Sequence, residues 1–222
     1  MRNPEYKPVG KGRPPMKDGE DRRARILDCA LRLFAEQGIR GTTAAQIAKA
    51  SAVTPAMVNY YFGNREGLID AVVNERFGPM LHGMWEGMDG DLPANPLVIL
   101  ETLIDRLVAA VEAMPELPAL WSREVLYADG CLKGRITEKL PLAAMKNVLR
   151  TLAASQRDGQ LHPGLNTEIF VFSIFSLIMV PLAASRDVEK FFGHPITRDQ
   201  LADHTRALLQ GPLFAGKANS GA

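Results

Sequence analysis

The residues that most often do chemistry in proteins are sparse in this sequence, and their spacing is not that of a catalytic or metal-binding set. The four histidines (His82, His162, His194 and His204) have neither a histidine four residues away nor an acidic cluster at ligand spacing. The sequence contains no G-x-S-x-G motif, no phosphate-binding loop and no dinucleotide-binding glycine pattern. It therefore predicts no catalytic residue, no bound metal and no cofactor.

Two helix-capping patterns indicate a different kind of site. In Thr43-Ala-Ala-Gln46 a hydroxyl and an amide can each satisfy a free backbone N–H at a helix start. Thr54 can cap a second helix, in which Pro55 suits the first turn. Both helices are short and a tight turn joins them, with the small residues Ala48 and Ala52 at the expected contact. This arrangement predicts a helix-turn-helix, whose second helix presents its first residues to the major groove of DNA.

Longer helices should surround this pair. An apolar stripe predicts a first helix from Arg22 that ends at Gly38; it consists of Ile26, Leu27, Ala30, Leu31 and Phe34. After Asn64, apolar residues keep helical spacing from Leu68 to Met88, about six turns. A helix of that length links two domains more naturally than it fits inside one.

The rest of the chain is also helical in pattern. Beyond a linker at residues 88–96 we expect helices near 96–113, 116–128, 133–158, 166–191 and 197–210, separated by proline and glycine. No alternating strand pattern of useful length occurs. The predicted fold class is all-α, with an N-terminal three-helix DNA-binding domain that a long helix joins to a C-terminal helical domain.

The stretch Arg25–Val73 closely resembles the DNA-binding domain of the TetR family of transcription regulators. The matching features are ALRLFAEQG in the first helix, GTT-xxx-IA at the start of the second, the A-x-V-TP turn, YYF, and the N-R-E-x-L opening of the fourth helix. These features cover about fifty residues. The remainder resembles the family only in its helical character and length, so the resemblance implies no particular ligand.

The resemblance implies that the starts of both short helices contact DNA. Thr43, with the free N–H groups of a helix start, suits a phosphate. Thr54, Pro55, Ala56 and Met57 begin the recognition helix, where Ala56 and Met57 can meet thymine methyl groups.

Four later positions also take roles from the resemblance. Asn59 stands where the family usually has a phosphate-binding tyrosine, but asparagine can instead pair with adenine, so both roles stay open. Tyr60 and Tyr61 can offer hydroxyls to phosphates, although Tyr61 is equally at core spacing. Arg65 matches the family's phosphate-binding lysine, and its alternative is a solvated residue of a first helical turn.

Charge is distributed unevenly along the chain. The net charge is +1, but residues 1–67 hold 12 basic and 7 acidic residues, whereas residues 68–222 hold 14 and 18. A basic N-terminal part suggests a polyanionic partner. Residues 1–20 lack hydrophobic periodicity, and we interpret them as a disordered basic arm. Their Gly12-Arg13-Pro14 core resembles a minor-groove hook, but a plain disordered tail is the favoured alternative.

The stretch 169–184 is too short and too interrupted to span a bilayer, which needs about 20 residues. It is apolar on all sides, and a subunit contact would supply the missing cover. The family resemblance likewise suggests a homodimer through the helices near 166–191 and 197–210.

A ligand cavity is expected among the C-terminal helices. The candidate effector-pocket residues are adaptable or aromatic: Met80, Met84, Trp85, Met88, Trp121 and Phe170. Core filling is the alternative for the methionines. Glu124 or Arg123, beside Trp121, can orient a polar group of the ligand.

Together these features predict a ligand-responsive transcription regulator: a repressor that binds a palindromic operator as a dimer and is released by a small molecule. The expected regions are the 1–20 arm, a 21–68 DNA-binding domain, a 69–214 effector and dimerisation domain and a 215–222 flexible tail. Cys29 and Cys131, far apart in helical stretches, favour a reducing cytoplasm, and the short apolar stretch 169–184 favours no membrane association. An enzyme with an unrecognised helical site and a purely protein-binding adaptor are the rival classes.

Overall fold

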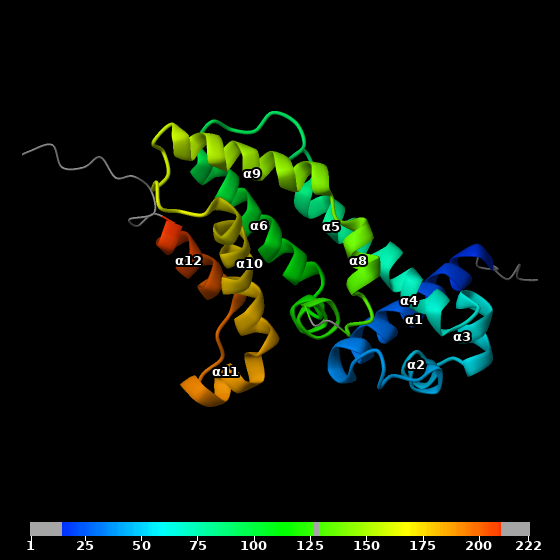
Figure 1. Cartoon of the computed structure of the whole chain (residues 1–222). Coiled ribbons are helices and arrows are strands. Elements are labelled where there is room, and N and C mark those ends of the chain that lie inside the picture. The colour runs from blue at the N-terminus through cyan, green and yellow to red at the C-terminus, as the bar shows by residue number, and fades with distance from the viewer. Residues whose placement is uncertain (1–14, 127–128, 210–222) are drawn as a thin grey trace, which may run out of the picture.

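The computed structural model describes residues 15–126 and 129–209, and within them every regular element is a helix (Figure 1). One end of the molecule consists of α1 (Pro15–Gln37), α2 (Ala44–Ala50), α3 (Pro55–Phe62) and α4 (Arg65–Val72). The other end is built mainly from α6 (Pro96–Ala113), α9 (Leu142–Arg157), α10 (Thr167–Ala183) and α12 (Arg198–Leu209). Between them lie α5 (Gly78–Trp85) and α8 (Lys133–Lys139). The all-α prediction is confirmed.

The first helix is longer than the sequence pattern predicts. α1 begins at Pro15, so the expected disordered arm does not extend over residues 15–20. Proline suits the first turn of a helix, and the sequence of residues 15–20 has no apolar stripe that could have indicated this early start. Gly38 ends the helix as expected, with a φ of +81° and its N–H bonded to the Phe34 carbonyl at 2.9 Å. The Gly12-Arg13-Pro14 core lies outside the described residues.

The predicted long fourth helix is a continuous run from Arg65 to Trp85, and it ends before Met88, the expected last residue. It consists of α4, the π-helical segment η1 (Val73–Phe77) and α5. A π-helical turn is rare and is wider than an α-helical turn, and it often occurs at functional positions. This helix passes from the end of the molecule that holds α1–α3 to the end that holds the C-terminal helices (Figure 1).

Two of the predicted C-terminal helices are divided in the structure, and a third changes from α-helical to π-helical along its length. The 116–128 helix is α7 (Leu117–Leu120) followed by a second π-helical segment, η2 (Trp121–Leu126). The 133–158 helix is interrupted between α8 and α9, where Pro141 lacks the N–H needed to continue α8. The 166–191 helix ends at Ala183, and α11 (Ser185–Phe192) follows in a new direction (Figure 1).

The core of the C-terminal end forms around α6. One face of this helix is fully buried and consists of Ile99, Leu100, Leu103, Ile104 and Leu107. Helices α5, α9, α10 and α12 all pack against it. Each buried aliphatic side chain stabilises the fold by roughly 1.5–3 kcal/mol relative to exposure.

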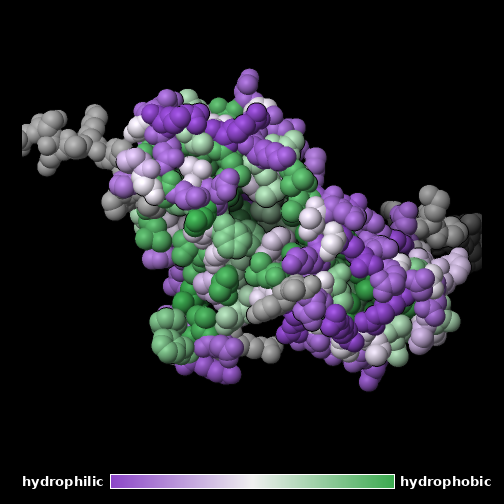
Figure 2. Space-filling model, viewed as in Figure 1, coloured by the Kyte–Doolittle hydropathy of each residue, from purple (hydrophilic) through white to green (hydrophobic). Residues whose placement is uncertain are grey.

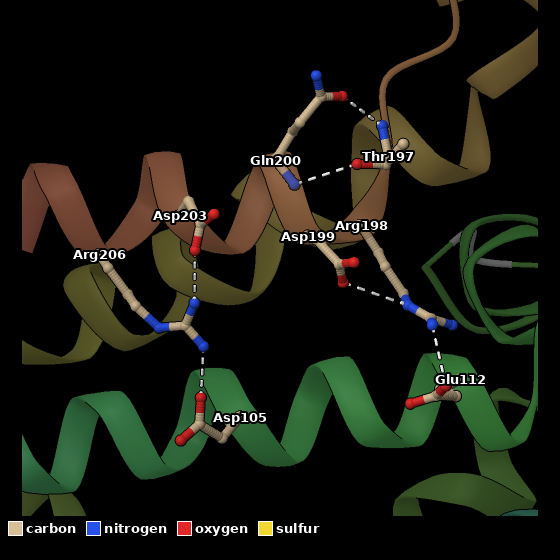
Figure 3. A network of polar contacts seen from close by, with 8 residues as sticks. All are labelled: Asp105, Glu112, Thr197, Arg198, Asp199, Gln200, Asp203 and Arg206. Carbon is tan, nitrogen blue, oxygen red and sulfur yellow. Dashed lines mark hydrogen bonds and ion pairs between the residues drawn. The ribbon is translucent and has the colours of Figure 1, made fainter.

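Ion pairs fasten α12 to α6 (Figure 3). Arg206 binds both Asp105 of α6 and Asp203 of its own helix, and the hydrogen bond that it donates to Asp105 raises the pKa of Arg206 above its ordinary value. Arg198 bonds to Glu112 of α6 at 2.9 Å. α12 therefore holds its position against α6 through polar contacts as well as through the burial of Leu201 and Leu209.

Hydrophobic surface is distributed unevenly. Figure 2 shows mostly hydrophilic residues over α1–α4 and much more hydrophobic surface over the C-terminal helices. Large exposed side chains there include Ile169, Phe172 and Val180 of α10 and Phe191 and Phe192 of α11. Within the described residues, none of the helices has both the length and the hydropathy needed to cross a membrane.

Candidate DNA-binding surface and effector cavity

The start of α2 has the capping geometry that the sequence predicts. Thr43 Oγ1 accepts a hydrogen bond from the Gln46 N–H at 3.2 Å, and Gln46 Oε1 accepts one from the Thr43 N–H at 2.7 Å. Thr43 is exposed. Ile47 and Ala48 turn the opposite face of the helix into the core. The helix therefore rests on its apolar side and presents its N-terminus to solvent.

Helix α3 also begins as predicted, and the residues at its start are exposed to solvent. Thr54 Oγ1 accepts a hydrogen bond from the Met57 N–H at 3.3 Å, and Pro55 occupies the first turn. Val58 and Phe62 are the buried residues of this helix. The predicted contact residues lie on the other side: Thr54, Pro55, Ala56, Asn59 and Tyr60 are exposed, and Met57 is half-buried. The predicted contact face of α3 is therefore open to solvent, apart from the half-buried Met57.

The turn between α2 and α3 differs from expectation at one residue. Ala48 lies at the helix contact and is buried, as predicted. Ala52 is exposed and adopts a φ of +54°, so its assignment to the inner contact is wrong. Its position in the left-handed region lets the chain reverse and allows the Val53 N–H to bond to the Ala48 carbonyl at 2.9 Å.

The two tyrosines of α3 have different environments. Tyr60 is 83% exposed, and its ring meets that of Tyr61 edge-on with 5.3 Å between centroids. Tyr61 is half-buried and packs against the core. The Tyr60 side chain is therefore open to solvent. Tyr61 packs against the core, which is one of the two roles that the sequence left open for it.

Arg65 has a structural role that the sequence did not indicate. Its guanidinium donates hydrogen bonds to the backbone carbonyls of Ile39 and Thr42, in the segment that joins α1 to α2. This planar fork holds that segment against the start of α4. The contact to phosphate stays a prediction, and any such contact would share the guanidinium with these two carbonyls.

A buried carboxylate joins the DNA-binding end to the C-terminal end. Glu124 of η2 is only 5% exposed. Its Oε1 accepts a hydrogen bond from the Ile39 N–H at 2.9 Å, and its Oε2 accepts one from the Cys131 N–H at 3.1 Å. The expected role of Glu124 in orienting a ligand is thus wrong, because both oxygens face backbone groups outside the cavity described below. Its long sequence separation from Ile39 explains why sequence reasoning missed the contact.

Arg135 of α8 makes a second connection. It bonds to Glu66 at 2.6 Å and also pairs with Asp70, so one guanidinium binds two carboxylates on successive turns of α4. The hydrogen bond that Arg135 donates to Asp70 is the main reason that the pKa of Arg135 is raised. No feature of the sequence around residue 135 singles out this partner.

A cavity of about 320 Å³ lies between α5, α7, η2, α9 and α10. Four of the predicted pocket residues line it: Met80, Met84, Trp85 and Trp121. Met88 and Phe170 do not line it, because both are buried in the core, at 3% and 8% exposure. The other lining residues are Leu81, Leu117, Leu140, Met145, Val148, Leu149, Glu168, Val171, Phe172 and Phe175.

The comparisons with known proteins agree with this arrangement. Residues 26–72 match the family model described as bacterial regulatory proteins, tetR family. The chain is 24% identical over 163 residues to the transcriptional repressor KstR2 of Rhodococcus jostii (strain RHA1), an alignment that covers 70% of this chain and 77% of that protein. It is 31% identical over 100 residues to the transcriptional regulator BetI of Rhizobium meliloti (strain 1021), covering 45% of this chain and about half (48%) of BetI.

Solved structures share the fold. The ketosteroid transcriptional regulator KstR2 of Mycobacterium tuberculosis superposes with a TM-score of 0.69 and 22% identity, covering 87% of this chain and 95% of that one. The hemolysin II transcriptional regulator HlyIIR superposes with a TM-score of 0.58 and 20% identity, covering 86% and 97%.

The helix-turn-helix at one end and the helical domain at the other define a DNA-binding transcription regulator rather than an enzyme. The N-terminal domain matches the model of the tetR family of bacterial regulatory proteins over residues 26–72.

Proposed function

We propose that this protein is a homodimeric repressor that binds a palindromic operator and releases it when an apolar small molecule enters the C-terminal cavity. The observation that carries the proposal is the first turn of α3, which is exposed while the opposite face of the helix is buried. Thr54, Pro55, Ala56, Met57 and Asn59 would meet base edges. Thr43, Tyr60, Tyr61 and Arg65 would meet phosphates.

The dimer would form through α10 and α12. Ile169, Phe172 and Val180 of α10 are 55–64% exposed, and Leu208 of α12 is 42% exposed. Apolar side chains of this size are stabilised when a second copy of the chain covers them. A two-fold dimer also places two α3 helices for two half-sites, which lie about 34–36 Å apart in successive major grooves.

Binding of the effector would change the separation of the two α3 helices. Helix α4 to α5 begins at the DNA-binding end and carries Met80, Met84 and Trp85 into the cavity wall. Trp121, also in the wall, lies in the same π-helical segment as Glu124, which holds Ile39. A ligand that shifts either element by a small amount changes how the two α3 helices are spaced, and a coupling of about 1–3 kcal/mol suffices for regulation.

The name of one structural neighbour includes ketosteroids, and another is a fatty acid degradation regulator from Bacillus halodurans. These names support an apolar effector here but identify none. We place the protein in the cytoplasm with its DNA, and we keep 21–68 and 69–214 as the two functional regions, although their boundary falls inside α4.

The test is operator binding by the purified full-length chain, measured by fluorescence anisotropy with fragments from upstream of its own gene. We expect one fragment to bind with a Kd of about 10⁻⁸ M or tighter, and binding to weaken steeply with salt. Asn59→Ala should impair the specific complex, with Glu138→Ala, an exposed change on α8, as the matched control. Failure of every upstream fragment to outcompete random DNA would refute the proposal.

A further inference from the structure

Trp121, which lines the cavity, carries a polar atom whose hydrogen-bonding capacity is unused. Trp121 Nε1 is buried and has no hydrogen-bond partner among the described residues. The indole ring packs edge-on against Phe175, with 5.1 Å between ring centroids. A buried donor without an acceptor costs free energy, and a ligand atom that accepts its hydrogen bond recovers that cost.

The rest of the wall favours an uncharged ligand. Glu168 is the single charged residue among the described residues that line the cavity, and it is exposed near the start of α10. A ligand carboxylate would lose its hydration against apolar side chains and would also face this carboxylate. Lys146 and Arg150 lie in an adjoining hollow, but Asp89 and Glu168 line the same hollow and balance their charge.

We propose that the cavity binds an uncharged apolar molecule with one hydrogen-bond acceptor, such as a ketone or ester carbonyl, and that Trp121 Nε1 donates to this acceptor. The proposal rests on the effector role proposed above for the same cavity. The volume of about 320 Å³ lies at the small end of the range for small-molecule sites.

The hydrogen bond from Trp121 Nε1 would also link the chemistry of the ligand to release of the operator. Nε1 is covered by neighbouring atoms, so an acceptor reaches it only when the indole ring shifts. Trp121 is the first residue of η2, and Glu124 of the same segment holds the Ile39 N–H. An apolar molecule without an acceptor can fill the cavity without engaging this ring nitrogen. A carbonyl compound should therefore be the better inducer at equal occupancy.

The experiment compares three probes of similar shape on the full-length protein: benzophenone, diphenylmethane and diphenylacetate. Calorimetric titration gives a Kd for each. Trp85 and Trp121 are the two tryptophans of the chain and both line the cavity, so a change in tryptophan emission on addition of diphenylmethane or diphenylacetate places these probes there. We expect diphenylacetate to bind at least about 10-fold more weakly than benzophenone, because its charge must be desolvated.

Trp121→Phe keeps an aromatic ring in the wall and removes the donor. The ratio of the diphenylmethane Kd to the benzophenone Kd should fall by about 3- to 10-fold in this variant, the usual worth of one neutral hydrogen bond. Trp85→Phe is the matched control, because it changes the same wall and leaves the Trp121 donor in place. It should weaken both probes alike.

An unchanged ratio in Trp121→Phe, or tighter binding of diphenylacetate than of benzophenone by the unmodified protein, would overturn the proposal. The second comparison needs no variant, so it stands even if Trp121→Phe folds poorly. Operator binding is measured separately: a protein that binds its operator but prefers the carboxylate would refute the ligand class and leave the regulator function intact.

Discussion

Glu124 and Arg65 form hydrogen bonds to the two backbone polar groups of the same residue, Ile39. Glu124 accepts the hydrogen bond of the Ile39 N–H at 2.9 Å, and Arg65 donates to the Ile39 carbonyl. Ile39 itself is 1% exposed and lies in the segment that joins α1 to the helix-turn-helix. The position of α2 therefore depends on a carboxylate of the C-terminal end and on a guanidinium of α4 at once.

Replacing Glu124 with glutamine should weaken this connection. An amide can accept from one backbone N–H, but its NH₂ group would face the other donor, so one buried N–H is left without an acceptor. We expect a loss of about 1–3 kcal/mol in the free energy of unfolding, measured in urea. The inducer response should also be reduced. Glu138→Gln, at an exposed position, is the control, and equal stability of the two variants would contradict the buried role of Glu124.

Arg65 can be tested for its two roles separately. Arg65→Lys keeps the positive charge, but an ammonium cannot bond to both carbonyls with the geometry of a guanidinium. We expect a fall of about 1–2 kcal/mol in stability, measured by thermal unfolding without DNA. If stability is unchanged while affinity falls equally for all DNA sequences, phosphate binding is its main role.

The α3 face should separate base contacts from phosphate contacts. Met57→Ala and Asn59→Ala should change the preference among operator variants by about 1–3 kcal/mol for each base that the side chain reads. Tyr60→Phe should weaken all sequences alike, because phosphates carry no sequence information. Competition assays with single-base operator variants measure both effects. A uniform loss of affinity from all three substitutions would mean that another face of α3 enters the groove.

Ala52→Gly should stabilise the DNA-binding domain. A residue with a side chain at a φ of +54° is strained, and glycine removes that strain. The expected gain is about 1 kcal/mol in the free energy of unfolding. Ala45→Gly, at an exposed position inside α2, is the matched control and should cost about 0.5–1 kcal/mol. Destabilisation by both changes would show that the turn tolerates alanine without strain.

The Arg23–Glu75 pair should contribute to stability in a pH-dependent manner. Arg23 of α1 bonds to Glu75 of η1, with one contact at 2.6 Å, and this hydrogen bond lowers the pKa of Glu75. Because the folded-state pKa is the lower one, the contribution is complete above the unfolded value of about 4.3 and is lost as pH falls through the folded value. Urea unfolding from pH 6 to pH 3 measures it.

Glu75→Gln should flatten the decline of stability below about pH 4.3, by an amount within the range of about 0–1 kcal/mol for partly exposed pairs. Glu36→Gln, on the exposed side of α1, is the control. If the free energy of unfolding falls with pH equally steeply in both variants and in the unmodified protein, other carboxylates cause the acid sensitivity.

The sequence alone determined the local elements of the DNA-binding domain. A capping box at Thr43, a capping threonine with a following proline at Thr54, and a glycine after a helix end at Gly38 each depend on residues within four positions of one another. These three features could therefore be placed without a structure. The helical period likewise predicted a long helix from Leu68 to Met88, most of which is the observed run from Arg65 to Trp85. It could not reveal the two π-helical turns, and the polar residues 15–20 hid the early start of α1.

Only the tertiary structure decided which distant residues meet. Periodicity marks a residue as apolar or buried but does not say what it faces, so Met88 and Phe170 have the pattern of cavity residues and belong to the core instead. Glu124 and Ile39 are brought together by the docking of η2 against the α1–α2 segment. Many weak apolar contacts between helices far apart in the chain stabilise this packing together. No local stretch of the sequence can therefore predict it.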